Sequence, residues 1–369
     1  MKTRINLLVL SLWVSFNARS QELIPIDTNN WKIQARAYVL EKHMGTDAIY
    51  LQAGAMTLKD KEFKNGIIEF DIHLKKEQAF PGVYFRANNT SGDSEQFYVR
   101  PHQSGNPDAN QAAPTTKNIS PWQLYFGPKY SFPYEYNYDT WTHIKILVNE
   151  ENAQIFMDHS DKPNLSWKLF HKPESGKIIL RGGNSSGFHI ANIKISSDTP
   201  ELIDFKPVER EAIPSLIQEW EVSDMFEEKL LHNPNDFGKV LENRSWQGKI
   251  QVEEGTAANI SRIQNLRDGT PGNTVLAKIT ITSDKDQIKL FEFGYSDRVV
   301  AILNGEPIYW GNNKWRSRDY RYLGTVGLFD GIYLNLQKGK NELLMAVSED
   351  FGGWLITGRF TDSKGIKIK

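Results

Sequence analysis

The sequence predicts an all-β protein built from two β-sandwich domains in tandem. Short runs of residues that suit β-strands recur from Trp31 to Phe360, and Gly, Asn, Pro or Asp separate them at regular intervals. The first half contains no long stretch with the period of an amphipathic helix. A chain of 369 residues, of which 39% are hydrophobic, is long enough to bury two such cores.

The N-terminus has the pattern of a secretory signal peptide. Lys2 and Arg4 give it a positive start, residues 7–16 are a short apolar run, and Ala18 and Ser20 frame a cleavage site. We therefore expect residues 1–20 to be removed before Gln21. No other run approaches the roughly 18 apolar residues of a membrane span, so the sequence predicts a secreted protein, periplasmic or extracellular, with no membrane span.

Composition excludes several classes of function. The chain contains no cysteine, which rules out disulfides, thiolate metal sites and a cysteine nucleophile. Export without cysteine is more typical of a bacterial protein than of a eukaryotic one. Basic and acidic side chains number 44 and 45, for a net charge of −1, so no nucleic-acid partner is expected.

The pattern of strands and breaks divides the mature chain into two halves. The first half, residues 21–198, has strand patterns at residues 48–52, 66–74, 82–86, 96–100, 122–126, 142–148, 153–157, 177–181 and 188–195. A charged segment with three prolines follows, and we interpret residues 199–216 as a linker. The second half, residues 217–369, has strand patterns at residues 217–222, 249–253, 274–283, 287–293, 298–303, 331–336, 341–348 and 354–360, with a short helix over 223–231.

Residues 95–126 are the most informative stretch for function. The sequence predicts a strand over 96–100, a loop rich in Gly, Pro, Asn and Asp, and a second strand over 122–126. Side chains alternate between the two faces of a strand. Aromatic and polar residues should therefore share one face and apolar residues the other. With the strand over 82–86 and the loop, this alternation predicts a ligand-binding set of Tyr84, Arg86, Gln96, Tyr98, Arg100, Gln103, Asp108, Gln123 and Tyr125.

A family resemblance rests on several motifs in order. FKNGIIEFDI, GVYFR, FYVRPHQSGNPDANQ and WTHIKILVNEENAQIFMD in the first half resemble the concanavalin A-like lectin/glucanase superfamily, including its laminin-G-like and 3-keto-disaccharide hydrolase-type domains. AILNGEPIYWG and LQKGKNELLMAV in the second half resemble a galactose-binding-like jelly roll. The resemblance implies two jelly-roll sandwiches and a polysaccharide or oligosaccharide as the partner.

Candidate catalytic residues lie on the predicted strand over 66–74. Glu69 and Asp71 point to one face, about 6.8 Å apart along a strand. This spacing is long for a retaining glycosidase pair and near the short end for an inverting pair. The resembled laminarinase-type enzymes have a further acidic residue, but this chain has His73 and Leu74 at the corresponding positions. If the protein cleaves glycans, Glu69, Asp71 and His102 are the expected catalytic residues.

No zinc-binding motif occurs, because the eight histidines are scattered through the sequence and no HExxH pattern is present. We therefore expect no cofactor and no catalytic metal. A structural Ca²⁺ is the one metal for which the sequence offers oxygen ligands, at Asp93 and Glu95, at Asp108, or at Asp158 and Asp161.

Three functions remain open from the sequence. The first is an exported bacterial carbohydrate-binding protein that recognises a glycan on a concave aromatic-polar sheet face of the first domain. The second is a glycoside-cleaving enzyme of the 3-keto-disaccharide hydrolase or laminarinase-like kind. The third is a protein–protein adhesion module. Arg100 is the residue we expect to matter most, since a planar guanidinium can bond two sugar hydroxyls at once.

Overall fold

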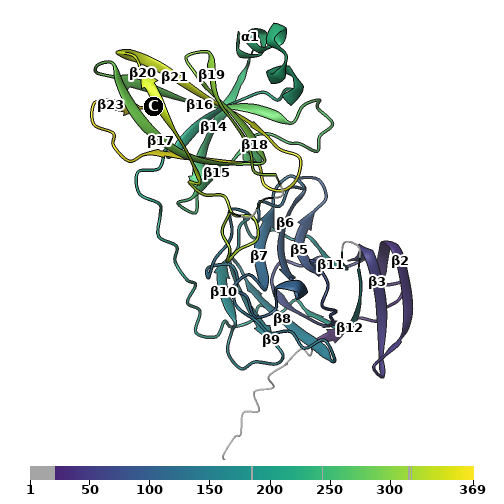
Figure 1. Cartoon of the computed structure of the whole chain (residues 1–369). Helices are drawn as coiled ribbons and strands as arrows, with labels where there is room; N and C mark the ends of the chain where they lie inside the picture. The colour runs from purple at the N-terminus through teal and green to yellow at the C-terminus, as the bar shows by residue number, and fades with distance from the viewer. Residues whose placement is uncertain (1–20, 184–185, 243, 315, 317) are drawn as a thin grey trace, which may run out of the picture.

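The computed structural model describes residues 21–183, 186–242, 244–314, 316 and 318–369. In this part of the chain, the strands form two sheets, one of twelve strands and one of eleven, and each sheet curls into a sandwich-like half (Figure 1). The signal-peptide prediction concerns residues 1–20, which lie outside the described residues. No helix in the described part is long and apolar enough to cross a bilayer.

The first sheet contains the strands from Glu22 to Ser196. Its order is β10-β9-β8-β4-β12-β3-β11-β5-β6-β7, with β1 paired to β12 and β2 paired to β3. The strands are β1 (Glu22–Leu23), β2 (Trp31–His43), β3 (Thr46–Leu58), β4 (Gly66–His73), β5 (Gly82–Asn88), β6 (Asp93–Val99), β7 (Asn110–Thr115), β8 (Trp141–Asn149), β9 (Asn152–Met157), β10 (Leu165–Lys168), β11 (Lys177–Arg181) and β12 (Gly187–Ser196). A 3₁₀ turn, η1 (Pro101–Gln103), follows β6.

The second sheet contains the strands from Glu219 to Ile368. Its order is β19-β18-β21-β16-β13-β14-β15-β22-β17-β20, with β23 paired to β16. The strands are β13 (Glu219–Ser223), β14 (Trp246–Glu253), β15 (Ala257–Asn259), β16 (Thr274–Ser283), β17 (Gln287–Ser296), β18 (Arg298–Leu303), β19 (Glu306–Asn312), β20 (Asp330–Leu336), β21 (Gly339–Ser348), β22 (Leu355–Phe360) and β23 (Ile366–Ile368). The helical segments are η2 (Glu228–His232), α1 (Pro234–Glu242) and η3 (Ile260–Arg262).

Each half has its own apolar interior. Phe70, Phe85 and Phe97 are fully buried in the first, and Trp220 and Phe293 are fully buried in the second. Their strands alternate between these buried residues and more exposed ones, as period-two patterning requires. The prediction of an all-β fold with two sandwiches is therefore confirmed.

Two local predictions are wrong. Residues 122–126 form turns and not a strand, and β7 takes the position beside β6 instead. Asn110 and Gln111 in β7 are polar but buried, because their side chains bond the backbone oxygens of Phe132 and Trp122. Likewise, residues 223–231 are only partly helical: Ser223 ends β13, and residues 228–231 belong to the 3₁₀ segment η2. The α-helix α1 begins later, where Pro234 supplies a first-turn residue with a preset φ.

A long hairpin extends from the first sheet. β2 and β3 are 13 residues each and pair along almost their full length (Figure 1). The chain reverses at Met44 and Gly45, which both have positive φ, the geometry that tight hairpin turns need. Most of β2 is exposed, and in the sheet order it pairs only with β3. β2 therefore forms a free edge next to β3.

Candidate functional site between the two sheets

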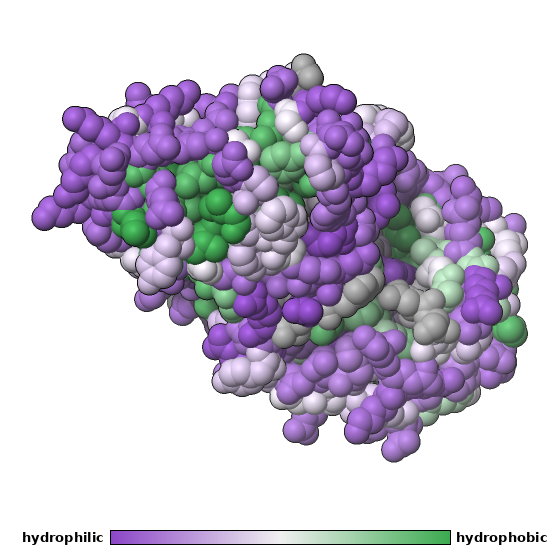
Figure 2. Space-filling view, turned by 45° about the horizontal axis from the view of Figure 1, so that its top comes forward, coloured by the Kyte–Doolittle hydropathy of each residue, from purple (hydrophilic) through white to green (hydrophobic). Residues whose placement is uncertain are grey.

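A cavity of about 930 Å³ lies where the two halves meet. The first half contributes β5, β6 and the end of β11, and the second contributes the end of β17 and the loops near residues 313–329 and 351–352. Figure 2 shows a mostly hydrophilic surface that is hollowed between the two halves. The cavity is large enough for a drug-sized or oligosaccharide-sized ligand.

The first-half wall is the aromatic-polar face that the sequence predicts. Tyr84 of β5 lies opposite Gln96 of β6, and Tyr98 lies opposite Gly82. Tyr84, Gln96 and Tyr98 all line the cavity. Arg181 at the end of β11 also lines the cavity and donates a hydrogen bond from Nη1 to the Tyr84 hydroxyl at 2.9 Å. The wall thus combines flat rings with amide and guanidinium groups.

Beneath this wall, Arg100 is held in a buried network. It is 1% exposed and pairs through Nη1 with the Asp108 carboxylate and through Nη2 with the Gln111 amide oxygen. Its Nη2 also donates to the Tyr98 hydroxyl at 2.9 Å. Asp108 in turn accepts the backbone N–H of Leu323 at 2.6 Å. Burial raises the pKa of Asp108 to about 6, although Arg100 opposes the shift. Arg100 also lines the cavity, but most of its guanidinium N–H groups bond neighbouring protein groups and so stabilise the fold.

Arg86 does not join this face. The register between β5 and β6 shifts between Phe85 and Asn88, and Arg86 has φ of 52°. This bulge breaks the alternation that placed Arg86 beside Tyr84. The guanidinium instead donates to the backbone oxygens of Lys64 and Glu150, both at 2.7 Å. Arg86 therefore ties loops together at the other side of the strand.

Gln123 and Tyr125 lie in turns, so the alternation of side chains along a strand does not determine where they point. Gln123 lines the cavity and bonds the second half, which makes it part of the junction. Tyr125 is buried away from the cavity, with its hydroxyl donating to Glu253 at 2.8 Å.

Of the loop residues, Gln103 bonds Asn106 on the surface. His102 packs edge-on against Phe80 with ring centroids 5.4 Å apart.

The charged form of the His102 imidazole is disfavoured in this setting. Both ring nitrogens are buried without a hydrogen-bond partner among the described residues. Burial lowers the pKa of His102, and the nearby Arg100 lowers it further. Phe80, its packing partner, lines the cavity, whereas His102 lies behind that ring.

Glu69 and Asp71 are not beside the aromatic-polar face. They lie on β4, which β12, β3 and β11 separate from β5 in the sheet order. His143 Nδ1 lies 2.6 Å from Asp71 Oδ1, and Asn192 donates to Asp71 Oδ2 at 2.6 Å. Burial opposes the shift, but these two hydrogen bonds lower the pKa of Asp71. Glu69 accepts from Gln21 and pairs with Lys145 at 3.3 Å. Both carboxylates lie away from the cavity, because β4 is not a neighbour of β5.

The second half contributes acidic candidates, Asp297 and Glu349, that sequence reasoning missed. Asp297 lines the cavity and accepts the backbone N–H groups of Asp350 and Phe351 at 3.2 and 3.1 Å. Burial raises the pKa of Asp297. Burial, followed by the charge of Asp297, raises the pKa of the fully buried Glu349 well above its usual range. Arg267 and Arg316 are exposed and add positive charge to the same cavity.

Asp93, Glu95, Asp108 and Asp158, four of the five carboxylates suggested for calcium, accept hydrogen bonds from the protein. Asp93 accepts the backbone N–H of Lys117 at 2.9 Å, and Asp158 accepts that of His143 at 2.8 Å. Glu95 accepts the N–H groups of Phe170 and His171 at 3.0 and 2.8 Å. Among the described residues, the one group of three or more metal-ligand side chains within reach of a single ion is His43, His73 and His189. A structural Ca²⁺ stays a prediction.

No protein-family model and no curated protein matches the sequence. Solved structures with similar folds include a carbohydrate-binding module, CBM66, from Bacillus subtilis, at 10% identity and TM-score 0.33 over 46% of this chain and 96% of that chain. They also include the catalytic domain of an endo-1,3-β-glucanase (laminarinase) from Thermotoga petrophila, at 12% identity and TM-score 0.35 over 48% and 97%. A third is a B. subtilis protein of unknown function with a galectin-like fold, at 10% identity and TM-score 0.35 over 46% and 90%.

Each likeness covers less than half of this chain. The galactose-binding-like character of the second half stays a prediction.

Proposed function

We propose that this protein binds a glycan in the cavity between its two sandwiches. The observation that carries the proposal is the chemistry of the cavity wall, where the rings of Phe80, Tyr84 and Trp122 alternate with the amides and guanidinium groups of Gln96 and Arg181. Aromatic rings cover the apolar C–H faces of sugars, while planar polar groups bond their hydroxyls. The site is therefore shared by both halves, and not confined to one sheet face.

The charge of the second wall refines the ligand class. Arg267 and Arg316 are exposed at the cavity, and Asp297 is held by backbone donors and has a raised pKa. We therefore expect glycans that contain uronic acids to bind more tightly than neutral glucans. Binding of the acidic glycans should weaken as salt concentration rises.

A glycan array with tag-free mature protein tests the proposal, followed by titration calorimetry of any ligand found. Tyr84→Ala should weaken binding about fivefold, since a lost ring contact of this kind is worth on the order of 1 kcal/mol. The matched control is Tyr333→Ala, because Tyr333 is 72% exposed on the second sheet and does not line the cavity. Saturable binding that Tyr84→Ala and Tyr333→Ala reduce equally would contradict the proposed site.

A second candidate function, glycan cleavage, has one specific observation in its favour. Asp297 reaches the cavity with a raised pKa, and the buried carboxyl of Glu349 lies behind it. A carboxyl whose pKa is raised holds its proton to higher pH, which favours the role of a general acid. Release of reducing ends or keto-sugars from a bound glycan, lost in Asp297→Asn while binding persists, would support an enzyme. Binding without product release would support a binding protein.

A further inference from the structure

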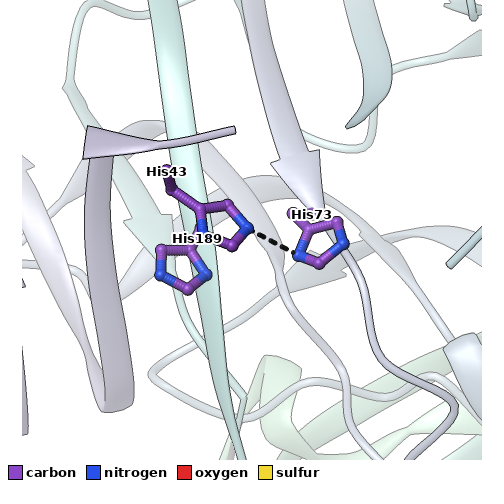
Figure 3. Close-up of side chains that lie close together, drawn as sticks. All are labelled: His43, His73 and His189. Atoms are coloured by element: carbon purple, nitrogen blue, oxygen red, sulfur yellow. Dashed lines mark hydrogen bonds between the residues drawn. The ribbon is translucent and has the colours of Figure 1, made fainter. Parts of the chain in front are cut away.

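Three histidines that are far apart in the sequence meet at one point of the first sheet. His43 ends β2, His73 ends β4 and His189 lies in β12 (Figure 3). One potential ligand atom from each lies within 4.8 Å of the other two. His73 and His189 are direct cross-strand partners, and the β2–β3 hairpin brings the third ring to them.

The rings are closely packed. His43 Nε2 lies 3.0 Å from His73 Nδ1, as the dashed line in Figure 3 shows. The rings of His43 and His189 stack with centroids 3.6 Å apart and an interplanar angle of 2°. Trp141 packs edge-on against His43 and His73, with centroids 5.5 and 6.0 Å away, and forms an apolar wall. An apolar surround of this kind strengthens metal–ligand bonds by excluding water.

The second nitrogens of two rings have the partners that metal-binding histidines usually have. His73 Nε2 lies 3.0 Å from the backbone oxygen of Tyr138, and His189 Nε2 lies 2.8 Å from Glu41 Oε1. A carbonyl or carboxylate that holds one ring nitrogen fixes the tautomer, so the other nitrogen presents its lone pair. In His73 that nitrogen is Nδ1, which faces His43. In His189 it is Nδ1, which is buried and has no hydrogen-bond partner in the part of the chain that the structure describes.

Imidazole binds metals in its neutral form, through the lone pair of one ring nitrogen. Potential ligand nitrogens of all three rings lie within 4.8 Å of one another, so a cation placed between them could accept a lone pair from each ring.

We propose that His43, His73 and His189 form a binding site for a divalent first-row transition metal, with Zn²⁺ as the ion that this ligand set best suits. Imidazole is a good ligand for Zn²⁺, and a three-histidine set leaves a fourth position for water. Two nitrogens on one tetrahedral Zn²⁺ lie about 3.4 Å apart. The stacked rings of His43 and His189 would have to turn out of their parallel arrangement, whereas His43 and His73 are already near this spacing.

The site would clamp the hairpin to the body of the sheet. β2 pairs only with β3 in the sheet order and is largely exposed. A metal held jointly by β2, β4 and β12 would fix the tip of the hairpin across two other strands. The sequence gives no sign of the site, because its ligands are separated by 30 and 116 residues (43 to 73 and 73 to 189) and match no spacing motif.

The test uses the mature chain without a polyhistidine tag, stripped of metal by a chelator and titrated with ZnCl₂ by calorimetry. We expect one Zn²⁺ per chain, and Co²⁺ should give the visible absorption of a tetrahedral nitrogen-ligated ion. His189→Gln should weaken Zn²⁺ binding more than about 100-fold, and Glu41→Gln about 10- to 100-fold through loss of the outer contact. The matched control, His232→Gln, removes an exposed histidine of the second half and should leave affinity unchanged.

A second measurement covers the case in which His189→Gln fails to fold. Zn²⁺ added to the wild-type chain should slow hydrogen exchange across residues 31–58, and this protection should shrink in Glu41→Gln, whose side chain is substantially exposed. The proposal is overturned if the wild-type chain binds no Zn²⁺, or if His189→Gln and Glu41→Gln bind it as tightly as His232→Gln does. In either case the three rings would be a packing cluster only.

Discussion

The side chain of Gln123 accepts a hydrogen bond from the backbone N–H of Gly353 at 2.9 Å, although the two residues are 230 positions apart. The backbone oxygen of Gln123 also accepts the N–H of Val326 at 3.0 Å. Close by, the Lys117 ammonium donates to the backbone oxygen of Ile263, and Arg210 donates to that of Leu124. These bonds join the two sandwiches around the cavity, so the cavity depends on their contact.

Gly353→Ala should weaken this junction. An added Cβ would lie 2.4 Å from Pro121 Cα, and backbone atoms cannot yield at low cost. We expect a loss of about 1–3 kcal/mol in unfolding free energy, as for other overpacking changes. Urea unfolding followed by tryptophan fluorescence measures it. The control is Gly238→Ala, in which nothing lies within 4 Å of the new Cβ. This change should make helix α1 slightly more stable. If Gly353→Ala and wild type are equally stable, the junction is not tightly packed at this position.

Arg100→Ala should destabilise the fold more than it should affect ligand contact. The substitution leaves the Asp108 carboxylate buried without its cation, and such a loss typically costs about 3–5 kcal/mol. Thermal and urea unfolding measure this cost. Arg267→Ala is the control, since its exposed side chain lines the same cavity and its loss should change stability by less than about 0.5 kcal/mol. If Arg100→Ala folds and is as stable as wild type, the structural role is contradicted, and Arg100 is better explained as a ligand-binding residue.

Ionisation of Glu95 should lower the free energy of unfolding as the pH rises toward neutrality. Burial raises the pKa of Glu95 to about 7 from an ordinary value of 4.5, although the N–H groups of His171 and Phe170 oppose the shift. Between these values the unfolded state releases a proton that the folded state keeps, so the folded state loses stability as pH rises from 4.5 to 7. The shift corresponds to about 3 kcal/mol, to order of magnitude.

Glu95→Gln removes this titration. The free energy of unfolding, measured from pH 4 to 8, should rise in the variant relative to wild type between pH 4.5 and 7. Above pH 7 the difference between the two proteins should stay constant. Asp362→Asn serves as a control, because that carboxylate is exposed on the second half. Parallel pH profiles for wild type and Glu95→Gln would mean that Glu95 is ionised throughout the range.

Export should remove the N-terminus. Lys2, Arg4 and the apolar run at residues 7–16 predict cleavage before Gln21. Intact-mass measurement of protein recovered from the periplasm or medium should show a chain that begins at Gln21 or within a few residues of it. Recovery of the exported product with residues 1–20 still attached would contradict the prediction.

Local alternation in the sequence determined the strands and one cavity wall. Tyr84, Gln96 and Tyr98 lie where period-two parity puts them, because side-chain direction along a regular strand is a local property. The same rule failed at Arg86, where a bulge reverses the parity, and over residues 122–126, where the chain turns. A bulge depends on the register of the partner strand, which the strand's own sequence does not encode.

Only the tertiary structure decided which distant residues meet. The cavity needs Asp297 and Phe351 of the second half opposite Tyr84 of the first, and no pattern in either segment specifies that contact. His43 and His189 meet because β12 pairs with both β3 and β4, while Glu69 and Asp71 miss the cavity because β4 is not next to β5. Strand order arises from non-local burial of apolar faces. The sequence therefore determined the kinds of side chain available, and the packing of the sheets decided which of them form a site.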